Sequence, residues 1–325
     1  LGVVNVPDPR LEKLESLVKP ERVMPATVEI VDIAGLVKGA SKGEGLGNQF
    51  LGNIRECNAI IHVLRCFEND NIVHVDGSVD PIRDKETIDI ELQLKDLETV
   101  EKRLEKVTRA AKAGDKKAAK EMDLLNRIKE ALLTGVSARA VQISDEEKEL
   151  MDSFQLLTTK PVLYVCNVDE KSAKNGNAYV EQVKDAVKGE DAEVIVLAVA
   201  TEADITELES YEERQMFLED IGLEEPGASK LIRAAYHLLN LQTYFTAGVK
   251  EVRAWTIHQG DTAPQAAGVI HTDFEKGFIR AEVIAYNDFI TYGSEAKVKE
   301  AGKMRVEGKE YIVKDGDIMH FRFNV

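Results

Sequence analysis

The chain has 325 residues, of which 44% are hydrophobic, and a formal net charge of −16 at pH 7. This length is too great for one small core and fits two or three domains. The longest apolar runs are too short to cross a membrane, and the strongly negative charge argues against a protein that coats nucleic acid non-specifically.

Four short apolar segments have the composition of buried β-strands. They span residues 27–33, 59–64, 161–166 and 193–199. Helical patterns lie between them at residues 46–57, 145–157 and 177–188. Strands that alternate with helices in this way predict an α/β domain with a parallel sheet and helices on both of its faces.

The segment from Asp84 to Gly135 contains no proline, and its one glycine before the end is Gly114. Apolar residues recur in it at spacings of three and four: Ile90, Leu94, Leu97, Val100, Leu104, Val107 and Ala111, then Ala118, Met122, Leu125, Ile128 and Leu132. This pattern predicts two long helices joined at a Gly-Asp turn. They would form an antiparallel hairpin inserted between two halves of the α/β domain.

Short strands and turns dominate after Leu241. Residues 249–257 and 279–284 have strand patterns, and Gly-Asp turns occur at 260–261 and 316–317. A small, separate β-rich domain is therefore predicted. The expected domains are the α/β domain at residues 1–83 and 136–240, the hairpin at residues 84–135 and the β-rich domain at residues 241–325. The three cysteines have no CxxC spacing, which favours reduced thiols in a cytoplasmic protein over disulfides or a zinc site.

The first apolar segment ends in Asp32-Ile33-Ala34-Gly35. An Asp-x-x-Gly at a strand end is what a P-loop nucleotidase places beside its Mg²⁺, where the Asp holds the metal and the Gly amide contacts the terminal phosphate. The five glycines of residues 35–50 suit a loop that reorganises around that phosphate. The alternative interpretation is a strand-end Asp followed by a surface loop with no chemical role.

A second motif, Asn167-Val168-Asp169-Glu170, follows the strand predicted at 161–166. GTPases have Asn-Lys-x-Asp here, and the Asp accepts two hydrogen bonds from guanine. Glu170 is one methylene longer, and Val168 replaces the Lys, so the basis for selecting guanine is removed. The motif is compatible with adenine, read by Asn167 and nearby backbone; an ordinary Asn-containing loop is the alternative.

Together these segments resemble the YchF/Obg-like ATPase family along the whole chain. The resemblance is carried by residues 31–48, 65–70, 79–84, 167–170, 240–256 and 271–281. It implies a P-loop NTPase-type parallel sheet, the inserted hairpin and a C-terminal TGS domain. It also implies an ATP-preferring hydrolase that associates with the ribosome.

The resemblance further assigns roles to single residues. Asp32 belongs to the Mg²⁺ site, Asn167, Val168 and Glu170 border the base, and Phe67 packs against it. Leu36 stands where related switches carry a glutamine that orients water. Because a leucine side chain makes no hydrogen bond to water, slow hydrolysis is implied, raised by a partner or by a monovalent cation.

One family feature is missing from these 325 residues. No Gly-x-x-x-x-Gly-Lys-Ser/Thr loop, whose backbone and Lys would hold the phosphates, occurs in the sequence, and neither does the threonine-bearing switch loop that follows it. The chain begins with Leu1, and the resemblance starts at Gly2. An N-terminal truncation of about forty residues is the expected explanation. By itself this chain is expected to bind phosphates poorly and to hydrolyse nothing.

Basic residues are concentrated at the predicted hairpin turn. Between residues 102 and 120 there are eight Lys or Arg and only two acidic residues, a local charge of +6. Lys112, Lys116 and Lys117 are the predicted contacts with RNA, through release of counterions from phosphates, although an ordinary solvated helix face has the same composition. A nucleotide-independent RNA or ribosome adaptor is therefore the alternative function. The sequence sets no oligomeric state.

Overall fold

This computed structural model describes residues 1–33 and 46–324. Gly35 and Leu36, the predicted phosphate-sensing and water-facing positions, lie outside the described residues. Within the described part of the chain, no helix is long and apolar enough to span a bilayer.

The chain divides into two compact units. One contains residues 1–30 and 231–325, and the other contains residues 31–230. The expected division had assigned residues 1–83 to the α/β domain. Residues 1–30 instead pack with the C-terminal residues, because β2 (Arg22–Met24) pairs with β8 (Glu251–His258) and Leu14 lies in the same core as Phe245.

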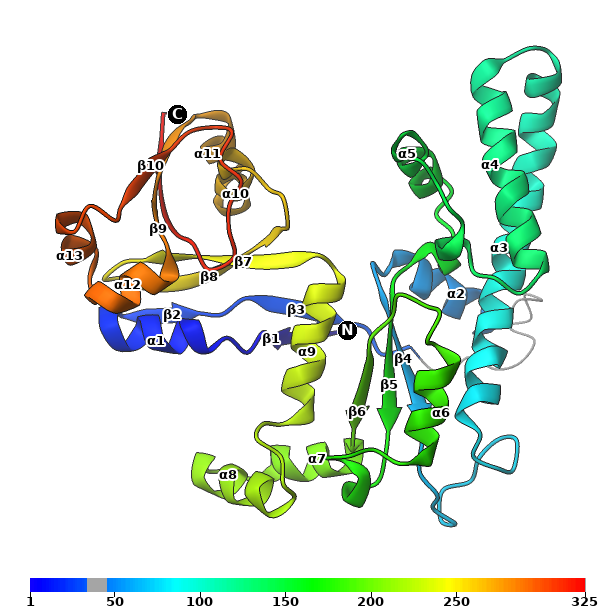
Figure 1. Cartoon of the computed structure of the whole chain (residues 1–325), viewed down its shortest axis with the longest axis horizontal. Helices are drawn as coiled ribbons and strands as arrows, with labels where there is room; N and C mark the ends of the chain where they lie inside the picture. The colour runs from blue at the N-terminus through cyan, green and yellow to red at the C-terminus, as the bar shows by residue number, and fades with distance from the viewer. Residues whose placement is uncertain (34–45, 325) are drawn as a thin grey trace. The chain divides into compact units, whose positions relative to one another are not determined.

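The unit of residues 31–230 is built around a three-stranded parallel sheet. Its strands are β4 (Ile60–Arg65), β5 (Val162–Asn167) and β6 (Val194–Leu197), in that order, with Leu64 opposite Cys166 and Cys166 opposite Val196. The central strand β5 is buried along almost its whole length, as expected for a parallel strand covered on both faces. Figure 1 shows α6 (Ala178–Ala186) beside this sheet. Besides the helices of residues 81–133, this unit contains α2 (Leu46–Glu56), α5 (Asp145–Ser153), α7 (Val199–Glu207) and α8 (Tyr211–Asp220).

Three of the four predicted strands are confirmed in this sheet, and the first one lies elsewhere. β3 (Thr27–Ile30) pairs antiparallel with β1 (Gly2–Asn5) along its whole length. Its apolar and polar residues alternate, and only Val28 is buried. A strand with one apolar face suits such a ladder better than the middle of a parallel sheet.

The predicted helical hairpin is present. It consists of α3 (Pro81–Lys112) and α4 (Lys116–Leu133). Asp115 begins α4 by accepting hydrogen bonds from the backbone N–H groups of Lys117 and Ala118. Gly114 has φ +94°, a left-handed conformation that glycine adopts without strain. The two helices share a core with α5 and the residues after it.

The buried face of α3 changes near the base of the hairpin. Ile90 and Leu94, predicted as core positions, are 52% and 46% exposed, whereas Leu92 and Asp96 are buried. At this level α3 no longer packs mainly on α4. Leu92 packs on α2 and on Leu157, which precedes β5. The apolar stripe predicted from the hairpin alone therefore has the wrong phase over the first turns of α3.

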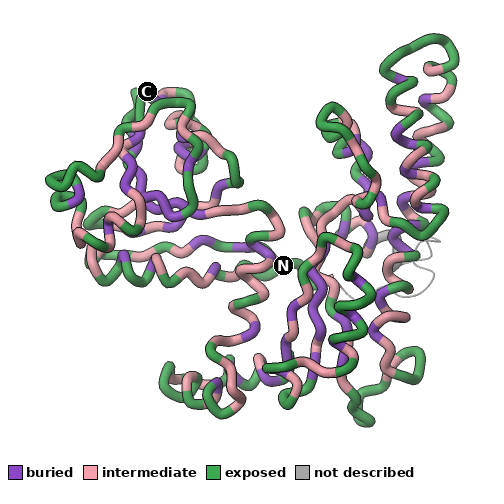
Figure 2. The backbone as a smooth tube through the Cα atoms, viewed as in Figure 1, coloured by how far each residue is buried: buried purple, intermediate pink, exposed green. Residues whose placement is uncertain are grey.

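The other unit contains a six-stranded mixed sheet in the order β10-β9-β11-β7-β8-β2. Its further strands are β7 (Leu241–Ala247), β9 (Phe278–Ile284), β10 (Arg305–Glu307) and β11 (Ile318–Phe323). The helices are α1 (Pro9–Val18), α9 (Gly227–Leu238), α10 (Ala263–Ile270), α11 (Thr272–Lys276), α12 (Tyr286–Tyr292) and α13 (Glu295–Glu300). Separate cores cover its two faces, one with Phe245 and one with Tyr244, and Figure 2 shows the buried residues along the strands. The predicted β-rich domain is thus present.

A partly buried charged cluster joins the base of α3 to the parallel sheet. The Lys85 ammonium group lies 2.6 Å from Asp89 and 3.0 Å from Glu190, and the Tyr164 hydroxyl donates to Glu190 at 2.7 Å. The ring of His62 lies 5.7 Å from that of Tyr164. Burial lowers the pKa of His62 to about 4, so this imidazole is neutral at pH 7.

Stability should therefore fall in acid through His62. Because its pKa is lower in the folded chain than in the unfolded chain, the unfolded state takes up the proton first. The free energy of unfolding should decrease between about pH 6.5 and pH 4, by up to about 1.4 kcal/mol per pH unit from this group. Urea unfolding at several pH values measures this slope. His62→Phe should flatten it relative to the parent, and His258→Asn, at an exposed histidine, should leave it unchanged; equal slopes in the parent and His62→Phe would contradict the assignment.

Candidate functional site

The candidate nucleotide site lies where the three parallel strands end. Parallel strands place their carboxyl ends at one edge, and ligands of open α/β sheets bind outside that edge. Here the loops after β4, β5 and β6 meet: Cys66 N donates to Asn167 O at 2.7 Å, and Val168 N donates to Leu197 O at 3.0 Å. The predicted base-binding residues come from two of these loops.

Asn167 ties the loop after β5 to the start of α7. Its side-chain Oδ1 accepts a hydrogen bond from Val199 N at 3.1 Å, and the residue is half-buried. This bond occupies the carbonyl end of the amide, and the Nδ2 end remains to donate. Asn167 is therefore placed to orient the loop that would face a base.

The other two motif residues point in opposite directions. Val168 is 3% exposed and packs in the core under the sheet, so its side chain faces away from any ligand at this edge. Glu170 is exposed and begins a 3-10 helix, Glu170–Ser172, which is capped by the Asp169 carboxylate accepting from Ser172 N. Of this pair, only Glu170 has its side chain free to contact a ligand.

Phe67 is held by an arginine that the sequence analysis missed. The Arg65 guanidinium lies 4.8 Å from the centre of the Phe67 ring. It also donates to the backbone carbonyls of Phe67, Asn69 and Ile72 at 2.9–3.2 Å. Arg65 thus fixes the loop after β4. An arginine at the last position of an apolar strand was the available signal, since its charge needs partners near the sheet edge.

Asp32 follows β3 and is exposed, and within the described residues it makes no hydrogen bond or ion pair. Its neighbour Ile33 packs on the cluster that contains Leu51 and Leu157, near the start of β5. No described contact joins Asp32 to Phe67, which follows the carboxyl end of β4, or to Asn167, the last residue of β5. A carboxylate with no partner among the described residues fits a Mg²⁺ ligand, and Asp32 would supply one such oxygen.

A second group of possible metal ligands, His74, Asp76 and Asp84, is already satisfied internally. Their ligand atoms lie within 4.8 Å of one another. His74 Nε2 is 2.8 Å from Asp84, and His74 Nδ1 accepts from Asp76 N. Arg83 pairs with both carboxylates. Both imidazole nitrogens already have hydrogen-bond partners. The group therefore stabilises the loop before α3 and the start of that helix.

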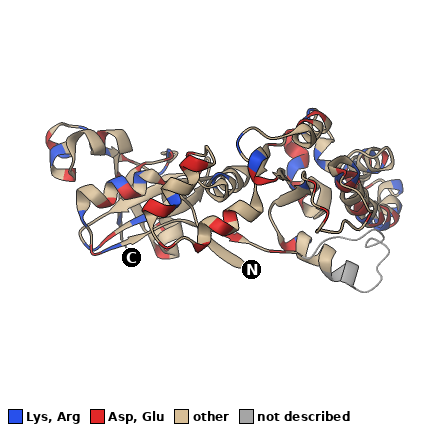
Figure 3. Ribbon diagram, turned by 90° about the horizontal axis from the view of Figure 1, so that it is seen from below, with Lys and Arg blue, Asp and Glu red and all other residues tan. Residues whose placement is uncertain are grey.

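The hairpin tip carries several unpaired cations. Figure 3 shows basic and acidic residues on α3 and α4. Three of the basic residues have acidic partners: Lys102 with Glu98, Arg103 with Glu121 and Lys120 with Glu146. The others are exposed and form no ion pair within the described residues: Lys106, Arg109, Lys112, Lys116 and Lys117. The three predicted RNA contacts are all in this free group.

The parallel sheet, the loops at its carboxyl edge and the Asp32 and Asn167 motifs define a class of protein, the P-loop-type α/β nucleoside triphosphatases. Sequence comparisons agree. A profile of the 50S ribosome-binding GTPase family (MMR_HSR1) matches residues 13–107. The YchF-GTPase_C profile, described as a protein of unknown function (DUF933), matches residues 241–324.

Relatives identify the family. The chain is 58% identical over 324 residues to the ribosome-binding ATPase YchF of Escherichia coli O157:H7, and 54% identical over 327 residues to that of Bacillus subtilis strain 168. Each match covers 100% of this chain and 89% of the relative. The structure of the Schizosaccharomyces pombe YchF GTPase matches with a TM-score of 0.89 and 40% identity, covering 98% of this chain and 86% of that one. The chain belongs to the YchF family.

Proposed function

We propose that this chain forms most of an ATP-binding, slowly hydrolysing switch that associates with the ribosome in the cytoplasm. The relatives are named either ribosome-binding ATPases or a GTPase, so the base preference needs its own argument. The proposal is supported by the loop after β5, where Asn167 is anchored to Val199 and Glu170 is exposed. In the sequence motif, Glu170 stands where GTPases carry the Asp that reads guanine.

Several residues of this chain would each contribute to nucleotide binding. Phe67, steadied by Arg65, offers an aromatic face to the base. Asn167 orients the loop. Glu170 is one methylene longer than aspartate and cannot reproduce the bidentate hydrogen bonds that an aspartate accepts from guanine. Asp32 would hold Mg²⁺, which neutralises phosphate charge when it is bound. The proposal that hydrolysis is slow, and is raised by a partner or a monovalent cation, rests on the leucine at position 36. That residue lies outside the described part of the chain.

We expect ATP to bind more tightly than GTP in a chain extended at Leu1 by a phosphate-binding loop. Calorimetric titration of both nucleotides measures the preference. Glu170→Asp should lower the ratio of ATP to GTP affinity by about tenfold, since a hydrogen-bonded base edge contributes a few kcal/mol to discrimination between bases. Val168 is unsuitable for a lysine substitution because it is buried.

Glu181→Asp is the matched control, because Glu181 is exposed on α6 and pairs with Lys184 of the same helix. It should leave the ratio of ATP to GTP affinity unchanged. Equal affinities for ATP and GTP in the extended parent would refute the proposed base preference.

The nucleotide-independent adaptor remains a second candidate function. The free cations of the hairpin tip support RNA contact whether or not nucleotide is bound. Ribosome binding that does not respond to ATP, ADP or their absence would favour the adaptor.

A further inference from the structure

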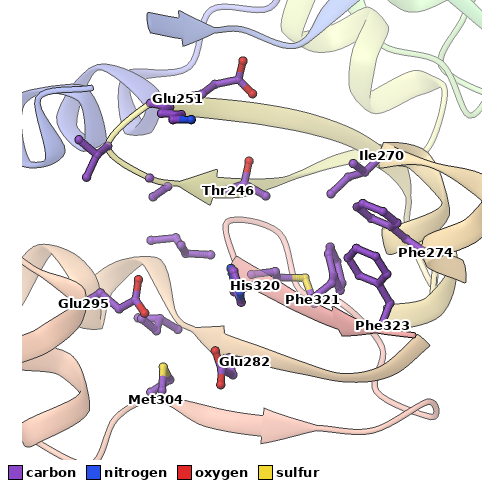
Figure 4. Close-up of a pocket in the computed structure, with 17 residues that line it drawn as sticks. Thr246, Glu251, Ile270, Phe274, Glu282, Glu295, Met304, His320, Phe321 and Phe323 are labelled. Carbon is purple, nitrogen blue, oxygen red and sulfur yellow. The ribbon is translucent and has the colours of Figure 1, made fainter. Parts of the chain in front are cut away.

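A cavity of about 470 Å³ in the C-terminal unit is lined by residues of β7, β9 and β11 (Figure 4). Two of the three glutamates in its lining already have cationic partners. Glu251 pairs with Arg22, and Glu282 pairs with Arg322. Because these charges are compensated within the chain, they select no ligand, and no occupant is assigned to the cavity.

One carboxylate joins α7 to α9 in the unit that contains the parallel sheet. Glu202, in the first turn of α7, accepts a hydrogen bond from Gly227 N at 2.7 Å through Oε1 and one from Ala228 N at 3.1 Å through Oε2. Both donors lie in the first turn of α9, where N–H groups have no partner within the helix. The helix dipole also favours a negative charge at this end. Glu202 therefore holds the start of α9 against α7.

Gly227 also brings the start of α9 against the last residue of β6. A Cβ atom at position 227 would lie 2.2 Å from Leu197 Cδ1 and 2.9 Å from Glu202 Oε1. Leu197 is only 7% exposed, so its side chain has little space into which it could move. The close approach of α9 to β6 therefore depends on the absence of a side chain at position 227.

The residues that α9 contacts or holds are the ones that fix the base-binding loop, Asn167–Glu170. Leu197 O accepts a hydrogen bond from Val168 N at 3.0 Å. Val199 N, at the start of α7, donates to Asn167 Oδ1 at 3.1 Å. Leu197 lies against Gly227, and Val199 belongs to the helix that Glu202 ties to α9. The start of α9 thus supports the base-binding loop through two routes.

We propose that Glu202 is a positioning residue for the base-binding loop. By holding α9 against α7 and β6, its carboxylate keeps Asn167 and Glu170 in the place where they would meet a base. Glu202 acts through Leu197 and Val199 and not by contact with the nucleotide. The inference rests on the proposed nucleotide site. The competing role is that of a helix cap, whose loss would loosen the first turn of α9 and nothing beyond it.

Amide hydrogen exchange of the chain without nucleotide separates these two roles. In Glu202→Ala, the amides of Val168 and Val199 should exchange at least about tenfold faster than in the parent, together with those of Gly227 and Ala228. Glu202→Gln keeps one acceptor oxygen and should show a smaller change at the same amides. Faster exchange confined to Gly227 and Ala228 would identify Glu202 as a helix cap and overturn the proposal.

Asp204→Asn is the matched control for the carboxylate, because Asp204 is exposed on the same helix. It should leave the exchange of the Val168 and Val199 amides unchanged. An equal increase in Asp204→Asn and Glu202→Ala would show that the charge of α7, and not the contact with α9, controls the loop.

Gly227→Ala perturbs the same contact from the side of α9 and keeps the Glu202 carboxylate, so it carries the test if Glu202→Ala does not fold. The added methyl group should displace Leu197 and speed exchange of the Val168 amide. Gly189→Ala is its control, because a Cβ atom at position 189 meets nothing within 4 Å. Unchanged exchange of the Val168 amide in Gly227→Ala would contradict the support of the loop by α9.

Nucleotide binding tests the consequence for the site, in the chain extended at Leu1 by a phosphate-binding loop. Calorimetric titration should show that Glu202→Ala weakens ATP binding by about tenfold. Its affinity for inorganic tripolyphosphate should not change, because this probe has no base to contact the loop. Unchanged ATP affinity, or an equal loss for both ligands, would overturn the positioning role. If the extended parent binds no nucleotide, the proposed function fails, whereas amide exchange still decides the role of Glu202.

Discussion

Replacing Asp96 with alanine should lower the free energy of unfolding by about 3–5 kcal/mol. Asp96 is fully buried on α3. Its carboxylate accepts from Leu157 N at 2.8 Å, from Thr158 N at 2.7 Å and from the Thr158 hydroxyl at 2.7 Å. Alanine would leave all three donors buried without an acceptor, and each such group costs about 1–3 kcal/mol.

The loss should extend beyond these bonds, because the Thr158 hydroxyl also accepts from Ala138 N at 3.0 Å. Asp96 therefore connects the base of α3 with the segment after α4 and with the entry to β5. Urea unfolding measures the effect. Asp96→Asn, which keeps one acceptor oxygen, should lose about half as much.

Glu98→Ala is the matched control on the same helix. Glu98 is partly exposed and pairs with Lys95 and Lys102, and such surface pairs contribute at most about 1 kcal/mol. An Asp96→Ala loss no larger than that of Glu98→Ala would show that Asp96 does not anchor the hairpin.

The periodicity of the sequence was sufficient to predict the regular parts of the fold. The β-branched runs became β4, β5 and β6, and the spacing of three and four became α3 and α4. These signals are local, because each depends on side chains a few residues apart. The Asn167 motif was also recognisable, since it directly follows an apolar strand.

Features that depend on distant residues could not be predicted in the same way. The pairing of Val23 with Val252 joins positions more than two hundred residues apart, and nothing in residues 1–30 points to that partner. In the sequence, Asp96 is one of several acidic residues between positions 84 and 98. Only the tertiary structure brings Leu157 and Thr158 to it and so reverses which face of α3 is buried. The burial of Val168 likewise depends on α6 and the neighbouring strands.

Reversing Lys112, Lys116 and Lys117 to glutamate should reduce co-sedimentation with ribosomes at low salt by about tenfold or more. Each reversal changes the charge by −2, so the local charge of residues 102–120 falls from +6 to zero. These three side chains are exposed and form no ion pair within the described residues, so they are free to approach phosphates. Affinity for ATP should not change, because the tip lies at the far end of α3 from the parallel sheet (Figure 1).

Salt dependence separates phosphate contact from a general change in net charge. A protein that loses three phosphate contacts should show a slope of log affinity against log salt that is smaller by about 2–3. The comparison variant reverses Lys297, Lys299 and Lys303, which are exposed on or next to α13, and changes the net charge by the same amount. If that variant loses binding and the hairpin variant keeps it, the ribosome contact belongs to the C-terminal unit. If both keep their binding and their salt slopes, neither basic group touches RNA, and the free cations of the hairpin tip are an ordinary solvated helix surface.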